Sequence, residues 1–160
     1  MNVYATEDRK VEEKATATEN KDEKLLSVVE LKKVCLDYAR RHFLGKEFAN
    51  KATGRTIKVS NDGLGEWKMK SKTREQVLSI KILDELLENS SFDHDAPDEK
   101  RRPNIENFSY FIYECVVNGT SFAAINTVKK TKPYGDKYYH HYLENIKIEP
   151  CSGTAPTPAG

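Results

Sequence analysis

Apolar residues in the first half of the chain recur at helical spacing in two places, and each place begins with a helix-start signal. Ser27-Val28-Val29-Glu30 fits a capping box, in which the serine and glutamate side chains bind free backbone amides at a helix start. The apolar positions that follow predict a first helix over 28–43. Thr73-Arg74-Glu75-Gln76 is a second capping box, and Val77, Ile80, Leu83 and Leu87 then share one helical face, which predicts a second helix over about 74–89.

The C-terminal half instead alternates apolar and polar residues, as strands do. Asn118-Gly119 separates two β-branched and aromatic runs, and this pair tolerates the positive φ angles of a type I′ hairpin turn. A two-residue turn places Val117 opposite Thr120 and assigns every residue of the hairpin to a face. The face expected under the helices carries Phe111, Tyr113, Cys115, Val117, Phe122, Ala124 and Val128. The open face carries Tyr110, Ile112, Glu114, Val116, Ser121, Ala123, Ile125 and Thr127.

The remaining segments complete a fold-class prediction. Residues 46–69 read as short strands broken at Thr53-Gly54 and Asn61-Asp62-Gly63, and residues 93–104 read as a long exposed loop with two prolines. A turn at 132–135 leads into a third antiparallel strand over 137–143. We therefore expect an α+β fold, with two helices packed on an antiparallel meander sheet.

Composition sets the domain boundaries. Residues 1–26 are charged and nearly free of apolar side chains, so we expect them to be disordered or to form a frayed helix. Residues 27–149 form a single predicted domain, and 150–160 resemble a linker-like tail. No apolar run is long enough for a membrane helix or a signal peptide, so we expect a cytoplasmic protein that contacts no membrane. The three cysteines lie far apart, which argues against disulfides and a zinc site.

Positive charge is concentrated in two segments. Residues 46–74 carry 8 basic against 3 acidic side chains, and residues 129–147 carry 5 against 2. The first segment combines cations with an aromatic ring, the mixture typical of a nucleic-acid surface. Its residues are Lys51, Arg55, Lys58, Trp67, Lys68 and Lys70. The alternative is an ordinary solvated strand surface. In the second segment Lys129 and Tyr139 belong to a similar mixture, although part of its tyrosines are expected to pack in the core.

His140-His141 is the candidate for chemistry. Histidine titrates near neutral pH and serves as a general base or acid in phosphodiester cleavage. Because adjacent strand residues point to opposite faces, only one of the two faces an open surface. The alternative is that both are surface histidines at a strand edge. Neither has partners at metal-ligand spacing, so no metal or other cofactor is expected.

Two stretches of the chain resemble those of a known family. They are residues 48–60, Phe-Ala-Asn-Lys-Ala-Thr-Gly-Arg-Thr-Ile-Lys-Val-Ser, and residues 138–146, Tyr-Tyr-His-His-Tyr-Leu-Glu-Asn-Ile, with Glu66-Trp67 and the Asn-Gly hairpin between them. Over about residues 27–149 the chain resembles the small domains of large polyvalent proteins of phages and conjugative elements. Those domains look similar to the barnase/EndoU/colicin/RelE-like nuclease fold. The resemblance implies metal-independent RNA cleavage by residues of the two stretches. The matching positions are Asn50, Lys51, Thr53, Gly54, Tyr139, His140 and His141.

These observations lead to a first functional hypothesis, a metal-independent endoribonuclease-like domain. His140 or His141 would deprotonate the ribose 2′-hydroxyl, a second donor would protonate the leaving 5′-oxygen, and Lys51 or Lys58 would stabilise the phosphate charge. Arg55, Lys58, Trp67, Lys68, Lys129 and Tyr139 would bind the RNA. The expected partners are RNA and a cognate inhibitor protein. The alternative is a noncatalytic accessory module of a mobile element that binds nucleic acid or protein.

Overall fold

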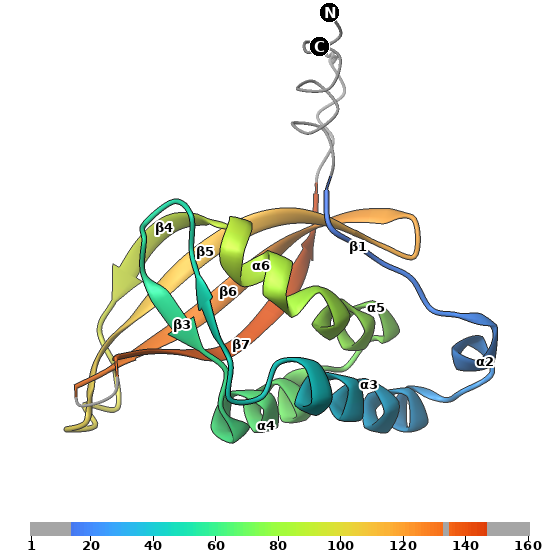
Figure 1. Cartoon of the computed structure of the whole chain (residues 1–160), viewed down its shortest axis with the longest axis horizontal. Helices are drawn as coiled ribbons and strands as arrows, with labels where there is room; N and C mark the ends of the chain where they lie inside the picture. The colour runs from blue at the N-terminus through green and yellow to red at the C-terminus, as the bar shows by residue number, and fades with distance from the viewer. Residues whose placement is uncertain (1–13, 133–134, 147–160) are drawn as a thin grey trace, which may run out of the picture.

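Three long antiparallel strands form the centre of the computed structural model, which describes residues 14–132 and 135–146 (Figure 1). They are β5 (Ile105–Val117), β6 (Thr120–Thr131) and β7 (Gly135–Asn145). Asn118 and Gly119 have φ angles of 48° and 81°, and Val117 pairs with Thr120. The hairpin turn and its register are therefore as predicted. Of the turn expected at 132–135, Pro133 and Tyr134 lie outside the described residues.

The complete sheet is mixed, which corrects the predicted fold class. It has seven strands in the order β1-β5-β6-β7-β3-β2, with β4 (Ser91–Ala96) also pairing with β5. β1 (Thr16–Ala17) runs parallel to β5, and β3 (Thr56–Lys58) runs parallel to β7. β2 (Glu47–Ala49) is antiparallel to β3. The expectation of two helices on an antiparallel meander was wrong, because segments distant in the sequence add parallel strands at both sides.

The helices are also more numerous than predicted. α3 (Val28–His42) begins at Ser27 with both capping-box hydrogen bonds, as expected. The predicted second helix is divided into α5 (Arg74–Leu78), a 3-10 turn (Ser79–Ile82) and α6 (Leu83–Asn89). α4 (Asn61–Lys70) was not predicted, and the short α2 (Lys21–Lys24) lies in the segment expected to be disordered or a frayed helix. None of the described helices is long and apolar enough to cross a membrane.

α4 lies where short strands were expected, because burial overrides its weak helical propensity. Its sequence contains two glycines, which lower helix propensity. The helix is nevertheless held to the sheet by Leu64 and Trp67, which are fully buried in the core. Gly63 brings the helix backbone close to β7, since a Cβ atom there would overlap the carbonyl oxygen of Tyr138. The predicted break at Asn61-Asp62-Gly63 is thus the first turn of a helix.

Residues 14–26 differ from the disorder expected for the charged segment 1–26. Ala15 and Ala17 are buried beside β5. Glu19 pairs with Arg74 at 2.7 Å, and Glu23 pairs with Lys81 at 2.6 Å. The described part of the segment therefore packs on the helices and the sheet. Residues 1–13 and the tail 150–160 lie outside the described residues.

One face of the sheet packs against the helices and forms the core (Figure 1). The predicted inner face of the hairpin is confirmed there, with Tyr113 and Phe122 at its margin. Its fully buried members are Phe111, Cys115, Val117, Ala124 and Val128. Residues of the opposite face are therefore available to line a site.

Candidate functional site

A β-bulge in β7 decides which of the two adjacent histidines faces the open side of the sheet. Thr127 pairs with His140 and Val128 pairs with Tyr138, so Tyr139 is an extra residue in β7. A bulge places two consecutive residues of one strand opposite a single partner and shifts the alternation of side chains. Tyr138 and His141 consequently both point into the core, whereas Tyr139 and His140 both line the open face.

His141 is a fully buried residue of the core. Its Nε2 lies 2.6 Å from Ser79 Oγ, and its Nδ1 lies 2.8 Å from the Tyr138 hydroxyl. Because Ser79 donates its hydroxyl hydrogen to the Gln76 carbonyl, it can only accept from His141 Nε2–H. Tyr138 then donates to Nδ1, and a neutral imidazole satisfies every group. Burial lowers the pKa of His141 to about 3, and the electrostatic interaction with His140 lowers it by a smaller amount.

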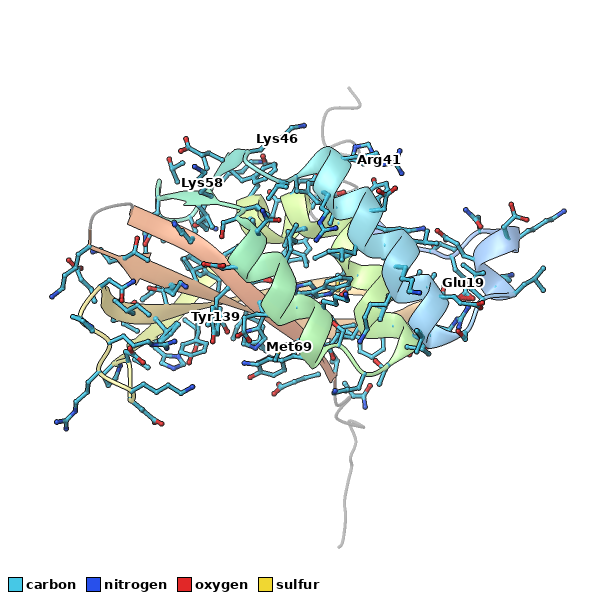
Figure 2. All side chains as sticks on the ribbon, turned by 90° about the horizontal axis from the view of Figure 1, so that it is seen from below. Glu19, Arg41, Lys46, Lys58, Met69 and Tyr139 are labelled. Atoms are coloured by element: carbon cyan, nitrogen blue, oxygen red, sulfur yellow. The ribbon has the colours of Figure 1, made fainter. Side chains whose placement is uncertain are left out.

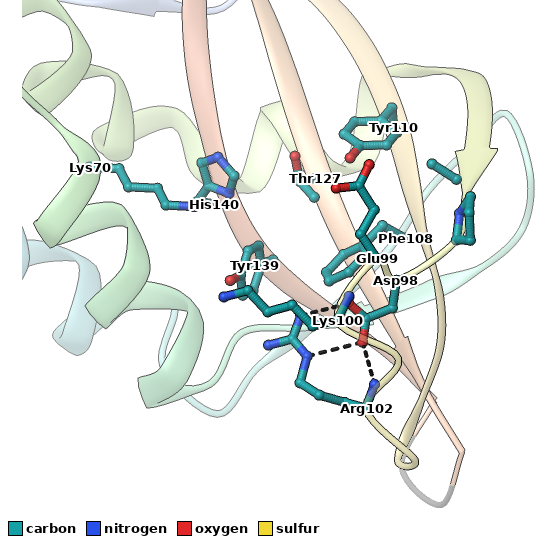
Figure 3. Close-up of a pocket in the computed structure, with 12 residues that line it drawn as sticks. Lys70, Asp98, Glu99, Lys100, Arg102, Phe108, Tyr110, Thr127, Tyr139 and His140 are labelled. Atoms are coloured by element: carbon teal, nitrogen blue, oxygen red, sulfur yellow. Dashed lines mark hydrogen bonds and ion pairs between the residues drawn. The ribbon is translucent and has the colours of Figure 1, made fainter.

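His140 forms part of a hollow of about 360 Å³, the open-face hollow (Figure 3). The sheet contributes Phe108, Tyr110, Thr127, Tyr139 and His140 to it. Lys70, in the last turn of α4, lies on one side, and the loop 96–102 after β4 closes the other. The hollow therefore joins the open sheet face, one helix end and the loop that was expected to be merely exposed.

Two polar atoms at the floor of the open-face hollow have no hydrogen-bond partner among the described residues. They are Nδ1 of His140 and Oγ1 of Thr127, which belong to paired residues of β7 and β6. Thr127 is only 3% exposed. Burial, and secondarily the charge of Lys70, lowers the pKa of His140 to about 4. At neutral pH this imidazole is uncharged and can accept a proton or a hydrogen bond.

Cations surround the aromatic ring of Tyr139 at the edge of the hollow. The ammonium groups of Lys70 and Lys129 lie 5.2 and 5.3 Å from the ring centroid. On the loop side Arg102 binds both carboxylate oxygens of Asp98, at 3.0 and 3.1 Å. This guanidinium holds the pKa of Asp98 well below its usual range. The Asp98–Arg102 pair also fixes the loop that closes the hollow.

The other sequence candidates lie elsewhere, and none of them lines the open-face hollow. Arg55 binds Asp136 with two hydrogen bonds, at 2.8 and 3.0 Å, and Ser109 with a third. Trp67 is fully buried and presents no ring for base stacking. Lys51 is exposed in the turn before Arg55, with its backbone amide bound to the Glu88 carbonyl.

Lys58 and Lys68 are both exposed but lie outside the open-face hollow. Lys58 projects from β3, well away from Tyr139 (Figure 2). Lys68 lies on α4, on the side that faces α3. Of the proposed catalytic and RNA-binding residues, the structure thus brings together His140, Tyr139 and Lys129, and Lys70 of the first basic segment lies beside them.

Sequence reasoning missed several residues of the hollow. Thr127 and Tyr110 had been placed on the open face by the hairpin register, which was the available signal for them. Phe108 follows from the same alternation. Lys100 and Arg102 had no signal, because nothing local indicates that their loop folds over the sheet. In the described part of the chain, no group of three or more His, Cys, Asp or Glu residues could hold a metal ion.

Comparison with known proteins assigns a family but no characterised relative. No curated protein and no solved structure matches the chain. The expected similarity to the barnase/EndoU/colicin/RelE-like nucleases is therefore not confirmed. The family described as large polyvalent protein-associated domain 3 matches residues 26–142, which includes α3 and most of β7. The chain therefore belongs to the family of large polyvalent protein-associated domain 3.

Proposed function

We propose that this polyvalent-protein accessory domain binds single-stranded RNA at its open-face hollow. The observation that carries the proposal is Tyr139, an aromatic ring flanked by the ammonium groups of Lys70 and Lys129. Proteins that bind single strands combine cations for the phosphates with aromatic rings for the bases. Tyr110 and Phe108 add two further rings to the same hollow.

The arrangement supports binding more strongly than the two-histidine cleavage mechanism. His141 is sealed in the core by Ser79 and Tyr138, so it cannot reach a bound phosphodiester. Lys51 does not line the open-face hollow. His140, His141 and Lys51, which were expected to catalyse together, are therefore not gathered at one site. RNA binding does not require them to be.

Cleavage of the bound RNA is a second candidate, and His140 is the residue that favours it. Its Nδ1 has no hydrogen-bond partner among the described residues, and its imidazole is neutral at pH 7. It would accept the proton of a ribose 2′-hydroxyl, with Lys70 or Arg102 beside the phosphate. A pKa of about 4 makes it a weaker base than an ordinary histidine, so cleavage would be slow.

The binding proposal is tested by fluorescence anisotropy with a fluorescein-labelled uridine 12-mer in EDTA. A K70A/K129A variant should bind at least about tenfold more weakly, because it removes both ammonium groups beside Tyr139. The matched K51A/K58A variant, with two exposed lysines outside the hollow, should stay within about twofold of wild type. Raising the salt from 50 to 200 mM should weaken wild-type binding by about 10–30-fold, as expected for roughly three phosphate contacts. Equal losses in both variants would refute the assigned site.

Cleavage is tested on the same RNA by gel electrophoresis in EDTA. If the domain cleaves RNA, H140A should slow product formation at least about tenfold while leaving the anisotropy titration nearly unchanged. H42A, at an exposed histidine at the end of α3, is the control. If the wild-type protein binds the RNA but forms no cleavage product, the cleavage candidate is eliminated and RNA binding remains as the proposed function.

A further inference from the structure

A second hollow, the α3–α4 groove, lies between two helices and shares no lining residue with the open-face hollow. Its walls are Val29, Lys32 and Lys33 on α3, and Lys68 and Met69 on α4, around about 350 Å³. Figure 2 shows these two helices side by side on the surface, with Met69 near the end of α4. Val29 and Met69 are each 67% exposed, so two large aliphatic side chains face solvent within one groove.

Most of the positive charge around the α3–α4 groove has no carboxylate paired with it, although Lys33 interacts electrostatically with Glu30. Among the ion pairs of the described residues, none includes Lys32, Lys68 or Lys72. Burial lowers the pKa of Lys32, and the charges of Lys72 and Lys68 lower it further. Like charges held this close are mutually unfavourable, and an acidic ligand would relieve that repulsion.

We propose that the α3–α4 groove docks an acidic amphipathic helix of a protein partner. Helix-in-groove recognition places an apolar stripe of the ligand against an apolar floor, with complementary charge at the rim. Val29 and Met69 supply the floor, and the lysines supply the rim.

Protein fits the groove better than nucleic acid. None of the described residues lining it has an aromatic ring on which a base could stack. A phosphate backbone also offers nothing apolar to cover Val29 and Met69, whereas leucine side chains would remove both from water. This inference rests on different residues from the proposed RNA site and does not depend on it.

The probe is a fluorescein-labelled 18-residue peptide with leucines at i, i+3, i+4 and i+7 spacing and glutamates on the flanks. A peptide of the same composition in scrambled order is its control. The full chain should bind the amphipathic peptide and bind the scrambled one at least about tenfold more weakly, because only the former presents an apolar stripe.

Groove variants locate the binding. M69Q removes half of the apolar floor, and K33E/K68E reverses two rim charges at exposed positions. Each should weaken peptide binding at least about tenfold. K46E/K58E, which reverses two charges at exposed lysines outside the groove, is the matched control and should change binding less than about twofold (Figure 2). Urea unfolding of each variant verifies that it is folded.

Two outcomes would overturn the docking proposal. One is equal affinity for the ordered and scrambled peptides, or no measurable affinity for either. The other is that K33E/K68E weakens binding of the uridine 12-mer but not of the peptide, which would make the groove part of an RNA surface. Loss of RNA binding in K70A/K129A with peptide binding intact would separate this proposal from the RNA-binding function.

Discussion

At the scale of single residues, two adjacent histidines have opposite environments. His140 lies in the open-face hollow, and its Nδ1 has no hydrogen-bond partner among the residues that the structure describes, whereas His141 is buried between Ser79 and Tyr138. Burial disfavours the charged form of both imidazoles, which carries a second ring proton. It lowers the pKa of His140 to about 4 and that of His141 to about 3. The unfolded chain has no such burial, so its histidines protonate near their ordinary pKa of about 6.5.

This difference predicts how stability depends on pH. Below about pH 6.5 the unfolded state binds protons that the native state excludes, so the free energy of unfolding falls as the pH falls. Each histidine contributes a slope approaching about 1.4 kcal/mol per pH unit, down to its native pKa. Above pH 6.5 neither contributes. Urea denaturation at intervals from pH 7 to 5 measures the slope. The carboxyl groups whose pKa is lowered stay ionised throughout this pH range.

Glutamine substitutions provide the control for the pH prediction. H141Q removes the titrating group but retains an amide that can donate and accept hydrogen bonds. It should reduce the slope between pH 6 and 5, and H140Q/H141Q should reduce it further. A double variant that keeps the wild-type slope would show that other groups cause the acid sensitivity.

At the scale of elements, α4 is the helix that connects the two candidate sites. Lys70 in its last turn lines the open-face hollow, and Lys68 and Met69 line the α3–α4 groove. Leu64 and Trp67 anchor the helix in the core. Its distance from β7 is set by Gly63, which leaves no space for a Cβ atom against the Tyr138 carbonyl. The position of both sites therefore depends on this close approach.

Two glycines of α4 give a matched pair for testing that approach. G63A should destabilise the protein by at least about 2 kcal/mol, because the added methyl group forces the helix away from β7. The methyl group of G65A meets no atom of the described residues within 4 Å, so this variant should instead stabilise the protein by about 0.5–1 kcal/mol through helix propensity. Urea unfolding measures both. Similar effects of the two substitutions would contradict the packing described for Gly63.

At the scale of the whole molecule, the N-terminal segment attaches to both layers of the fold. β1 pairs with the C-terminal end of β5, and Ala15 and Ala17 are buried beside that strand. Arg74 binds Glu19 and also the carbonyl oxygens of Glu23 and Leu26. The family match begins at residue 26, so Ala15, Ala17, Glu19 and Glu23 lie N-terminal to the matched residues.

Truncation tests whether the segment stabilises the domain. A chain that begins at residue 27 loses β1, α2 and the partners of Arg74 and Lys81, and its free energy of unfolding should fall by at least about 2 kcal/mol. A chain that begins at residue 14 keeps every contact described for the segment and serves as the reference. Equal urea midpoints for the two chains would show that these contacts add nothing to stability.

Local signals predicted part of the fold correctly. Ser27 and Glu30 form the expected capping box, Thr73 accepts the expected hydrogen bond from the Gln76 amide, and Asn118-Gly119 makes the hairpin turn. The same reasoning failed for α4 and β4, where no comparable local signal exists. For the candidate site it named Tyr139 among the RNA-binding residues without deciding which face of the sheet it occupies, and the structure places Tyr139 at the open-face hollow. It also assigned base stacking to Trp67, which is buried.

The amino-acid sequence was sufficient for features that depend on residues a few positions apart, namely helix starts, the tight turn and the register that follows from it. Their energetics involve hydrogen bonds and φ preferences within one short segment. Only the tertiary structure decided that His140 is open and His141 buried, that Arg55 is bound to Asp136, and that a loop closes the hollow. These outcomes depend on a bulge and on pairings between distant segments, whose energies come from burial and long-range contacts that no short stretch of sequence contains.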